Sequence, residues 1–202
     1  MRRFFCLISL LCCTLANAAG QISDIASALA SGAVSFRYSF EVRSDVPMSG
    51  NGTATLLGDA YHVAGNGMEF ICDGKTRWTL DRTAKEAYIE TVDADEVDYM
   101  ANPAVLLASL GEAFQRASQK STVFDGHNVV AFRLVPSIAG TGLDSVVLYV
   151  EGATPRGASI VIEDGTETVF HISGFKVEEK TDVKFSFDIG SLDSSYVVTD
   201  LR

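Results

Sequence analysis

Three histidines, a cluster of carboxylates and Cys72 are the side chains of this sequence that could carry out chemistry. His62, His127 and His171 are far apart, and none belongs to an H-x-H or H-x-x-x-H pair, the spacings that place two imidazoles on one metal ion. Each lies in or beside a predicted strand, so we interpret them as partly exposed strand residues. The sequence also lacks a G-x-S-x-G elbow, a phosphate-binding loop and a dinucleotide-binding glycine pattern.

The acidic cluster and the cysteine have simple interpretations. Asp93, Asp95, Glu96 and Asp98 resemble a calcium loop, but Asp98 stands where the EF-hand requires glycine and no glutamate follows at position twelve. Carboxylates at the start of a helix complement its dipole, which is the interpretation we adopt. Cys72 has neither cysteine nor histidine nearby, which favours a buried, inert thiol. We therefore predict no metal, no cofactor and no enzyme.

The N-terminus predicts export. Arg2 and Arg3 precede an apolar run at residues 4–15, and Ala16-Asn17-Ala18 has the small-x-small pattern that signal peptidase cleaves. The apolar run is shorter than the roughly 20 residues of a membrane-spanning helix. We therefore expect residues 1–18 to be a signal peptide and residues 19–202 to form a single domain in the periplasm.

Charge and cysteine content bound the mature chain. With 16 basic and 26 acidic residues, the full sequence carries a net charge of −10, which argues strongly against nucleic acid as a partner. Three of the four cysteines lie in the predicted signal peptide, so Cys72 remains without a partner for a disulfide. A hydrophobic core must then hold the domain together, and we expect a monomer.

Residues 50–89 alternate short apolar runs with glycine-bearing turns. Gly58-Asp59, Asn66-Gly67 and Asp73-Gly74 favour the positive φ angles of tight hairpins, so the runs between them are predicted to pair as antiparallel strands. Similar strands return after residue 122. The predicted strands are 34–43, 53–57, 60–63, 68–72, 77–81, one that starts at Ala87, 128–135, 146–150, 158–163 and 168–175.

Helices are predicted before and within this series of strands. Residues 21–31 place apolar side chains at helical spacing. Asn102 is suited to cap a second helix, with Pro103 in its first turn, that continues to Gln115. The acidic segment 93–100 is expected to begin a short helix. The fold class is mainly β with helices (α+β), because a curved antiparallel sheet with one apolar face needs a cover.

A row of aromatic residues has the character of a binding site. Phe36, Tyr38 and Phe40 alternate along one predicted strand and so share a face. Large side chains of the neighbouring strands and of the second helix are expected to line the same apolar cavity. The candidate cavity residues are Phe36, Tyr38, Phe40, Tyr61, Phe70, Trp78, Leu106 and Leu110. Such residues also build ordinary cores, and a register error of one residue would turn a strand's side chains over.

Several short motifs follow one another along the chain. They are G-x-G at Gly50 and Gly52, the aromatic Tyr61, C-D-G-K-T-R-W-T-L-D at 72–81, K-E-A-Y-I at 85–89, N-P-A-V-L-L-A-S-L at 102–110, and F-D-I-G-S-L-D-S-S-Y-V-V-T-D-L-R at 187–202. Taken in this order, they resemble the periplasmic lipoprotein carriers of the LolA type. The segment 187–202 is similar to the ending of LolA-like proteins from the Bacteroidetes group.

The resemblance implies a fold and a function. Members of the family form an unclosed half-barrel covered by a helical lid, and they accept the acyl chains of lipoproteins between the two. For this chain it implies a carrier that shuttles lipoproteins toward the outer membrane, with an inner-membrane release complex and an outer-membrane acceptor as partners. The acceptor shares the fold but is lipid-anchored, and the cysteines here do not fit a lipidation signal, which favours the carrier.

One departure from the family pattern concerns how the lid opens. Better-known proteobacterial carriers have an arginine followed by proline after the second strand, whereas this chain has Gly58-Asp59. In those relatives the arginine is understood to link barrel and lid. We expect opening without a polar latch here, Arg37, Arg77 and Arg82 being the nearest substitutes. The alternative function is a periplasmic module on the same fold that senses a lipid or a misplaced lipoprotein.

Overall fold

The computed structural model describes residues 31–92, 103–110, 113–138 and 141–202, together with Ile22, Asp24, Ile25 and Ser27. The predicted signal peptide and the acidic segment 93–100 lie outside the described residues. The strands are β1 (Ala33–Arg43), β2 (Met48–Leu57), β3 (Ala60–Gly65), β4 (Met68–Cys72), β5 (Thr76–Asp81), β6 (Glu86–Thr91), β7 (Phe114–Phe124), β8 (His127–Pro136), β9 (Leu143–Glu151), β10 (Thr154–Ile162), β11 (Glu167–Glu178) and β12 (Val197–Asp200), and the helical elements whose two ends are both described are α2 (Pro103–Ala108) and the 3-10 turn η1 (Ile189–Ser191).

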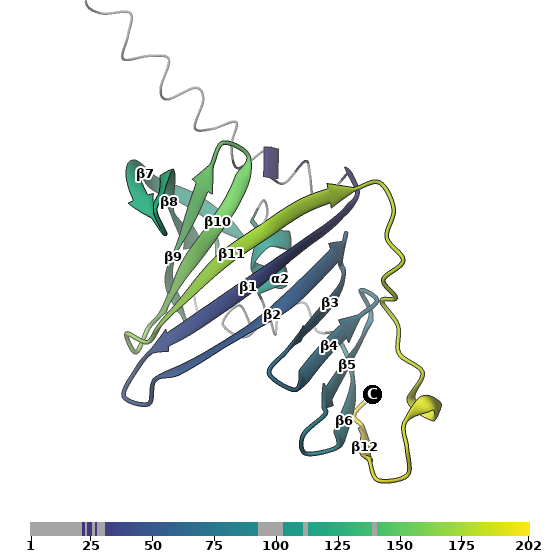
Figure 1. The fold of residues 1–202 in the computed structure, drawn as a ribbon. Coiled ribbons are helices and arrows are strands. Elements are labelled where there is room, and N and C mark those ends of the chain that lie inside the picture. The colour runs from purple at the N-terminus through teal and green to yellow at the C-terminus, as the bar shows by residue number, and fades with distance from the viewer. Residues whose placement is uncertain are drawn as a thin grey trace, which may run out of the picture.

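The twelve strands form one curved, unclosed sheet in the order β12-β6-β5-β4-β3-β2-β1-β11-β10-β9-β8-β7. All its ladders are antiparallel except the one between β12 and β6, which is parallel. Figure 1 shows the sheet bent so that β7 and β8 turn behind β9 and β10, with α2 on that inner side. The pairing of β1 with β11 joins the two halves of the chain. The fold is therefore mainly β.

The hairpins form where the sequence places residues that accept positive φ. Asn66 and Gly67 have φ angles of 52° and 80°, and Asp125 and Gly126 have 51° and 78°. Two consecutive residues with positive φ make the type of turn whose twist matches paired strands. This explains why the predicted strands of this region are observed with boundaries shifted by only a few residues.

The predicted helix 102–115 is wrong in its second half. Helix α2 ends at Ala108, and Phe114 and Gln115 already belong to β7. Gly111 lies between the two in the sequence, and glycine is among the poorest helix formers. Strand β7 was not predicted because it is an edge strand with mostly exposed residues, so its sequence lacks alternating apolar side chains.

The main core lies on the inner face of the sheet, which we define as the face that carries Phe36, Tyr38 and Phe40. Residues that pair directly across a ladder share a face, so Val34, Leu56 and Tyr61 form one row of it. The buried cluster extends across β1, β2, β3, β8, β9, β10 and β11 and includes side chains of α2 and Ile25. Ile22, Asp24, Ile25, Ser27 and Ser31 are helical, within the predicted helix 21–31.

A second core lies on the opposite, outer face, where the C-terminal segment crosses β4, β5 and β6. Strand β12 extends the sheet beside β6, and the Arg82 guanidinium lies 5.6 Å from the Phe187 ring centroid, within cation–π range. The chain end is thereby attached to the sheet. This cluster consists of Ile71, Trp78, Leu80, Ala87 and Ile89 of the sheet with Phe187, Ile189, Leu192 and Tyr196 of the C-terminal segment.

Glycines in β2 allow the aromatic side chains of β1 to lie across the neighbouring strand. Gly50 is opposite Phe40, and Gly52 is opposite Tyr38. A Cβ at Gly52 would lie 2.5 Å from the Ala64 carbonyl oxygen and 2.7 Å from the Tyr38 hydroxyl oxygen. Both distances are shorter than van der Waals contact, so the packing of the rings requires glycine at this position of β2.

Replacing Gly52 with alanine is therefore expected to lower the free energy of unfolding by about 1–3 kcal/mol, the usual range for overpacking. Urea denaturation followed by circular dichroism measures the change. Ser49→Ala, at an exposed position of the same strand, should shift the free energy by no more than about 0.5 kcal/mol. A Gly52→Ala protein that unfolds at the wild-type midpoint would contradict the close packing described here.

Candidate functional site

A row of aromatic rings along β1 and β11 is the most distinctive feature of the inner face. The ring centroids of Phe36 and Tyr38 are 6.5 Å apart, and those of Tyr38 and Phe40 are 6.4 Å apart. Phe170 of β11 lies 6.1 Å from Tyr38 and 6.0 Å from Phe40, and Phe175 stacks 6.4 Å from Phe36. All these separations are within the range of attractive aromatic pairs. The rings form a continuous apolar surface.

Side chains of α2, of the turn after it and of Ile25 are buried in the same cluster as these rings. Leu106 and Leu107 of α2 are each 1% exposed, Leu110 is 3% exposed, and Ile25 is fully buried, all in the same cluster as the aromatic row. Helix α2 contacts β2 and β3. Its six residues give it little stability of its own, because isolated helices this short do not form in water. Apolar packing on the sheet therefore holds α2 in place.

Seven of the eight predicted cavity residues lie together on the inner face. Phe36, Tyr38, Leu106 and Leu110 are buried in the main cluster, while Phe40, Tyr61 and Phe70 are partly buried against it.

The prediction was wrong for Trp78, the eighth residue, because its side chain belongs to the outer cluster under the C-terminal segment. On β5 the residues that pair into inner-face rows are Arg77 and Thr79, opposite Cys72 and Phe70, so Trp78 points the other way. The strand was predicted correctly, but which face of the sheet carries the Trp78 side chain depends on the register of the ladder.

Other inner-face residues were not proposed from the sequence as part of the site. Among them are Leu107, Phe170 and Phe175. The two phenylalanines lie in the predicted strand 168–175, where Phe170 and Ile172 alternate in the same way as Phe36 and Tyr38. That alternation would have identified Phe170. Phe175 lies within the bulge of the β1–β11 ladder, which is not visible in a sequence.

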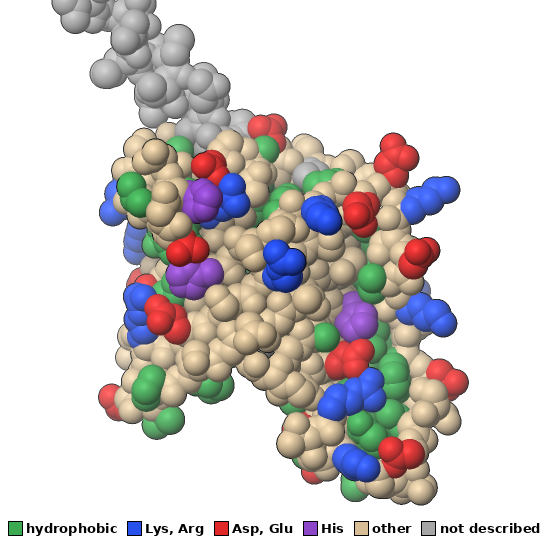
Figure 2. All heavy atoms as spheres, viewed as in Figure 1, with side chains coloured by type: hydrophobic (Ala, Val, Ile, Leu, Met, Phe, Trp, Pro, Cys, Tyr) green, Lys and Arg blue, Asp and Glu red, His purple; other side chains and the backbone are tan. Residues whose placement is uncertain are grey.

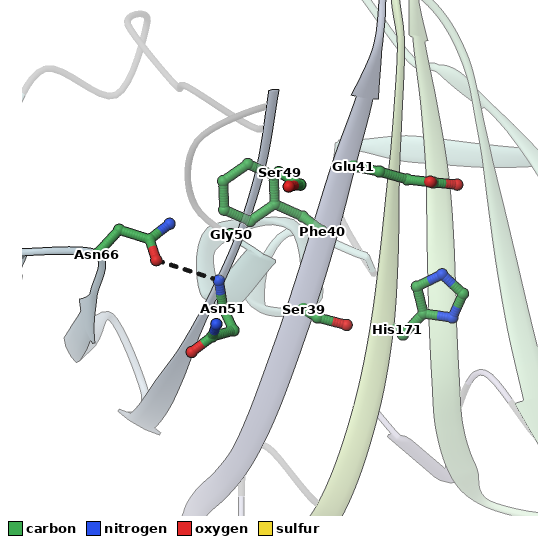
Figure 3. Close-up of a pocket in the computed structure, with 8 residues that line it drawn as sticks. All are labelled: Ser39, Phe40, Glu41, Ser49, Gly50, Asn51, Asn66 and His171. Atoms are coloured by element: carbon green, nitrogen blue, oxygen red, sulfur yellow. Dashed lines mark hydrogen bonds between the residues drawn. The ribbon is translucent and has the colours of Figure 1, made fainter. Parts of the chain in front are cut away.

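A shallow groove lies beside Phe40 (Figure 3), and its polar lining comes mainly from the outer face. Its volume is about 450 Å³, and most of its lining is polar. The Asn51 backbone N–H donates a hydrogen bond to Asn66 Oδ1 at 3.4 Å, which spans the side of the groove formed by β2 and the β3–β4 turn. The lining residues are Ser39, Phe40, Glu41, Ser49, Gly50, Asn51, Asn66 and His171.

The inner face carries a paired charge on β5 and β6. Arg77 donates to Glu90 Oε2 through Nε at 2.9 Å and through Nη2 at 2.7 Å, and both side chains are about one-third exposed. Tyr61 is in the same row, and burial raises its pKa to about 12. Burial also raises the pKa of the Cys72 thiol, which favours the inert protonated form.

The three histidines lie on the outer face, each beside a carboxylate. His62 Nε2 is 2.8 Å from Glu69, His127 Nδ1 is 3.2 Å from Glu151, and His171 Nδ1 is 3.7 Å from Asp125. Figure 2, which shows this face, has all three histidines near acidic or basic side chains. Within the described ranges no three His, Cys, Asp or Glu side chains are grouped closely enough to hold a metal ion. The acidic segment 93–100 is not among those ranges.

Comparison with known proteins places the fold and the family. Residues 64–188, more than half of the 202-residue chain, match the profile described as "Outer membrane lipoprotein carrier protein LolA". An uncharacterised conserved protein from Thermus thermophilus has the same fold, with a TM-score of 0.54 at 13% identity, over 91% of this chain and 99% of that chain.

A second solved structure is a LolA superfamily protein from Nitrosomonas europaea. It has a TM-score of 0.45 at 11% identity, over 84% of this chain and 97% of that chain. No functionally curated protein has a sequence that matches this chain. Among the helices in the described parts of the chain, none has the length and apolar character needed to cross a membrane.

Trp78 is the only tryptophan, so its fluorescence reports which face it occupies. Phe187→Ala removes a ring from the outer cluster and is expected to shift the emission maximum to longer wavelength, because water reaches the indole. Leu106→Ala removes a comparable apolar contact from the inner face and should leave the maximum unchanged. The opposite pattern, a shift with Leu106→Ala alone, would place Trp78 in the inner cavity.

Proposed function

The chain belongs to the LolA family of outer membrane lipoprotein carrier proteins, and we propose that it holds the acyl chains of lipoproteins against the inner face of its sheet. The observation that carries this proposal is the aromatic row of β1 and β11, which is covered by short helical segments and not by a second sheet. A cover of this kind leaves the sheet intact when it moves. We further propose that the function is carriage through the periplasm, with no catalytic step.

The energies of cover and cargo are comparable, which supports reversible loading. Burial of the three leucines of the cover is worth about 1.5–3 kcal/mol each, or roughly 5–9 kcal/mol together. Each methylene of an acyl chain kept from water is worth about 0.8 kcal/mol, so roughly ten of them give about 8 kcal/mol. Exchange of leucines for an acyl chain is then close to balanced. A carrier requires such a balance, because it must release its cargo.

The cover is proposed to act as a lid held by apolar packing. Leu106, Leu107 and Leu110 contribute buried apolar surface, whereas Gly58 and Asp59 form only the turn between β2 and β3. The three arginines considered as substitutes for a latch are engaged elsewhere. Arg37 is beside Gly174 on the outer face, Arg77 pairs with Glu90, and Arg82 pairs with Glu69.

Export and partners follow from the same proposal. Residues 1–18 would direct the chain to the periplasm as a cleaved signal peptide. An acylated protein does not readily cross an aqueous compartment unaided, because its methylenes would be exposed to water. We propose an inner-membrane release complex as donor and an outer-membrane acceptor as recipient, with the carrier acting as a monomer of one domain.

A charge placed in the lid tests the site. Leu106→Asp is expected to weaken binding of a synthetic diacylated lipopeptide at least about tenfold, because the carboxylate would be desolvated whenever the lid packs on the sheet. Fluorescence anisotropy of a labelled lipopeptide measures the affinity. Leu57→Asp is the matched control, since Leu57 is 44% exposed and lies outside the inner cluster.

Circular dichroism of both variants tests whether they fold. If Leu106→Asp does not fold, Leu110→Asp provides a second lid variant. Equal affinities for the Leu106 and Leu57 variants would refute an acyl site under α2.

Transfer of the lipopeptide to vesicles separates a carrier from the alternative sensing module. A carrier should pass the bound lipopeptide to phospholipid vesicles, whereas a protein that retains it in the presence of vesicles would be acting as a sensor.

Lid opening without a latch predicts little effect of removing single cations. Arg37→Ala, Arg77→Ala and Arg82→Ala are each expected to change the rate of lipopeptide transfer to vesicles by less than about fivefold, since exposed ion pairs are worth only about 0–1 kcal/mol. Stopped-flow dequenching of a labelled lipopeptide follows the transfer. A large change in any one folded variant would reveal a latch at that position.

A further inference from the structure

One polar group is buried without a partner on the inner face. Thr168, the second residue of β11, is fully buried, and its hydroxyl Oγ1 accepts and donates no hydrogen bond. Among the described residues it is the single buried side-chain oxygen or nitrogen in this condition. A buried hydroxyl that forms no hydrogen bond lowers the stability of the folded state, so such groups are rare in native proteins.

The ladder registers place Thr168 in line with the aromatic row. It pairs directly with Val42 of β1 and Ile160 of β10, and the next inner-face residue along β11 is Phe170, opposite Phe40. Residues two apart on a strand are separated by about 7 Å. The hydroxyl is therefore one step beyond the last rings of the row, on the same face.

The position also gives the site a direction. Strand β11 begins at Glu167, so Thr168 is close to the end of the sheet where turns join β1 to β2 and β10 to β11 (Figure 1). From Val42, beside Thr168, the row runs along β1 to Phe36, a distance of about 20 Å. That distance is comparable with the length of an extended long-chain acyl group.

We infer that Thr168 is the polar contact of the acyl site, where its hydroxyl donates a hydrogen bond to the carbonyl oxygen of an ester- or amide-linked acyl chain. The hydrocarbon tail then lies along Phe40, Tyr38 and Phe36, and the polar remainder of the cargo leaves at the end of the sheet. This inference rests on the proposed function and adds a preference, since a chain linked through an ether has no carbonyl to accept the bond. Because Thr168 is fully buried, the carbonyl reaches its hydroxyl only when neighbouring side chains move aside.

The variant Thr168→Val separates this role from packing, because valine keeps the shape and removes the hydroxyl. In the ligand-free protein it is expected to raise the thermal midpoint by about 2–4 °C, since an unpaired buried hydroxyl is lost. It should weaken binding of a diester lipopeptide about two- to tenfold, the range for one neutral hydrogen bond. Binding of the corresponding diether lipopeptide should be unchanged.

Thr55→Val is the matched control, because Thr55 lies on the outer face of β2, and it should alter neither affinity. The inference is overturned if Thr168→Val lowers the thermal midpoint, or if it weakens the diester and diether lipopeptides equally or not at all. In those cases the wild-type protein still binds both lipopeptides, and the proposed function stands. If the wild-type protein binds neither lipopeptide, the proposed function fails and the role of Thr168 fails with it.

Discussion

An apolar sheet face that cannot be buried by closure of the sheet is the constraint on which the rest of this structure depends. The strand order ends at β12 and β7, so the rings of β1 and β11 have no second sheet above them. Leaving apolar surface exposed to water costs about 25 cal/mol per Å², so burial by other parts of the chain is favourable. Leu106, Leu107 and Leu110 serve as cover, although α2 is only six residues long. Apolar packing thus determines both where the helix lies and how firmly it is held.

The two faces of the sheet are covered by elements of very different character. On the outer face the C-terminal segment is attached through β12, whose backbone pairs with β6, and through the ring of Phe187. Directional hydrogen bonds fix such an element in one register. On the inner face α2 forms no ladder with the sheet, and its leucines rely on non-directional apolar contact. The two covers therefore differ in how they are held: the outer one by backbone pairing, the inner one by apolar contact.

Strands bounded by glycine turns could be predicted from the sequence, since Asn66-Gly67 and Asp125-Gly126 specify hairpins locally. The row of Phe36, Tyr38 and Phe40 was also visible, because alternation within one strand needs no knowledge of its neighbours. The facing of Trp78 depends on the register between β4, β5 and β6, which no local pattern states. Strand β7 is stabilised by pairing with β8 and has little apolar signal of its own. Thr168 could not be recognised at all, because an unpaired hydroxyl is a property of the packed structure.

The pairing of β1 with β11 has a consequence for how the chain acquires its structure. Strands β1 to β6 and β7 to β11 are two meanders of local hairpins, each of which can form from neighbouring residues. Their junction connects residues near 40 with residues near 170, and contacts so distant in sequence close slowly because of the loop entropy. Until β11 emerges, the rings of β1 have no partner strand on that side. The apolar face is therefore assembled last, and a chaperone that protects the nascent chain would need to stay bound until nearly the whole sequence is available.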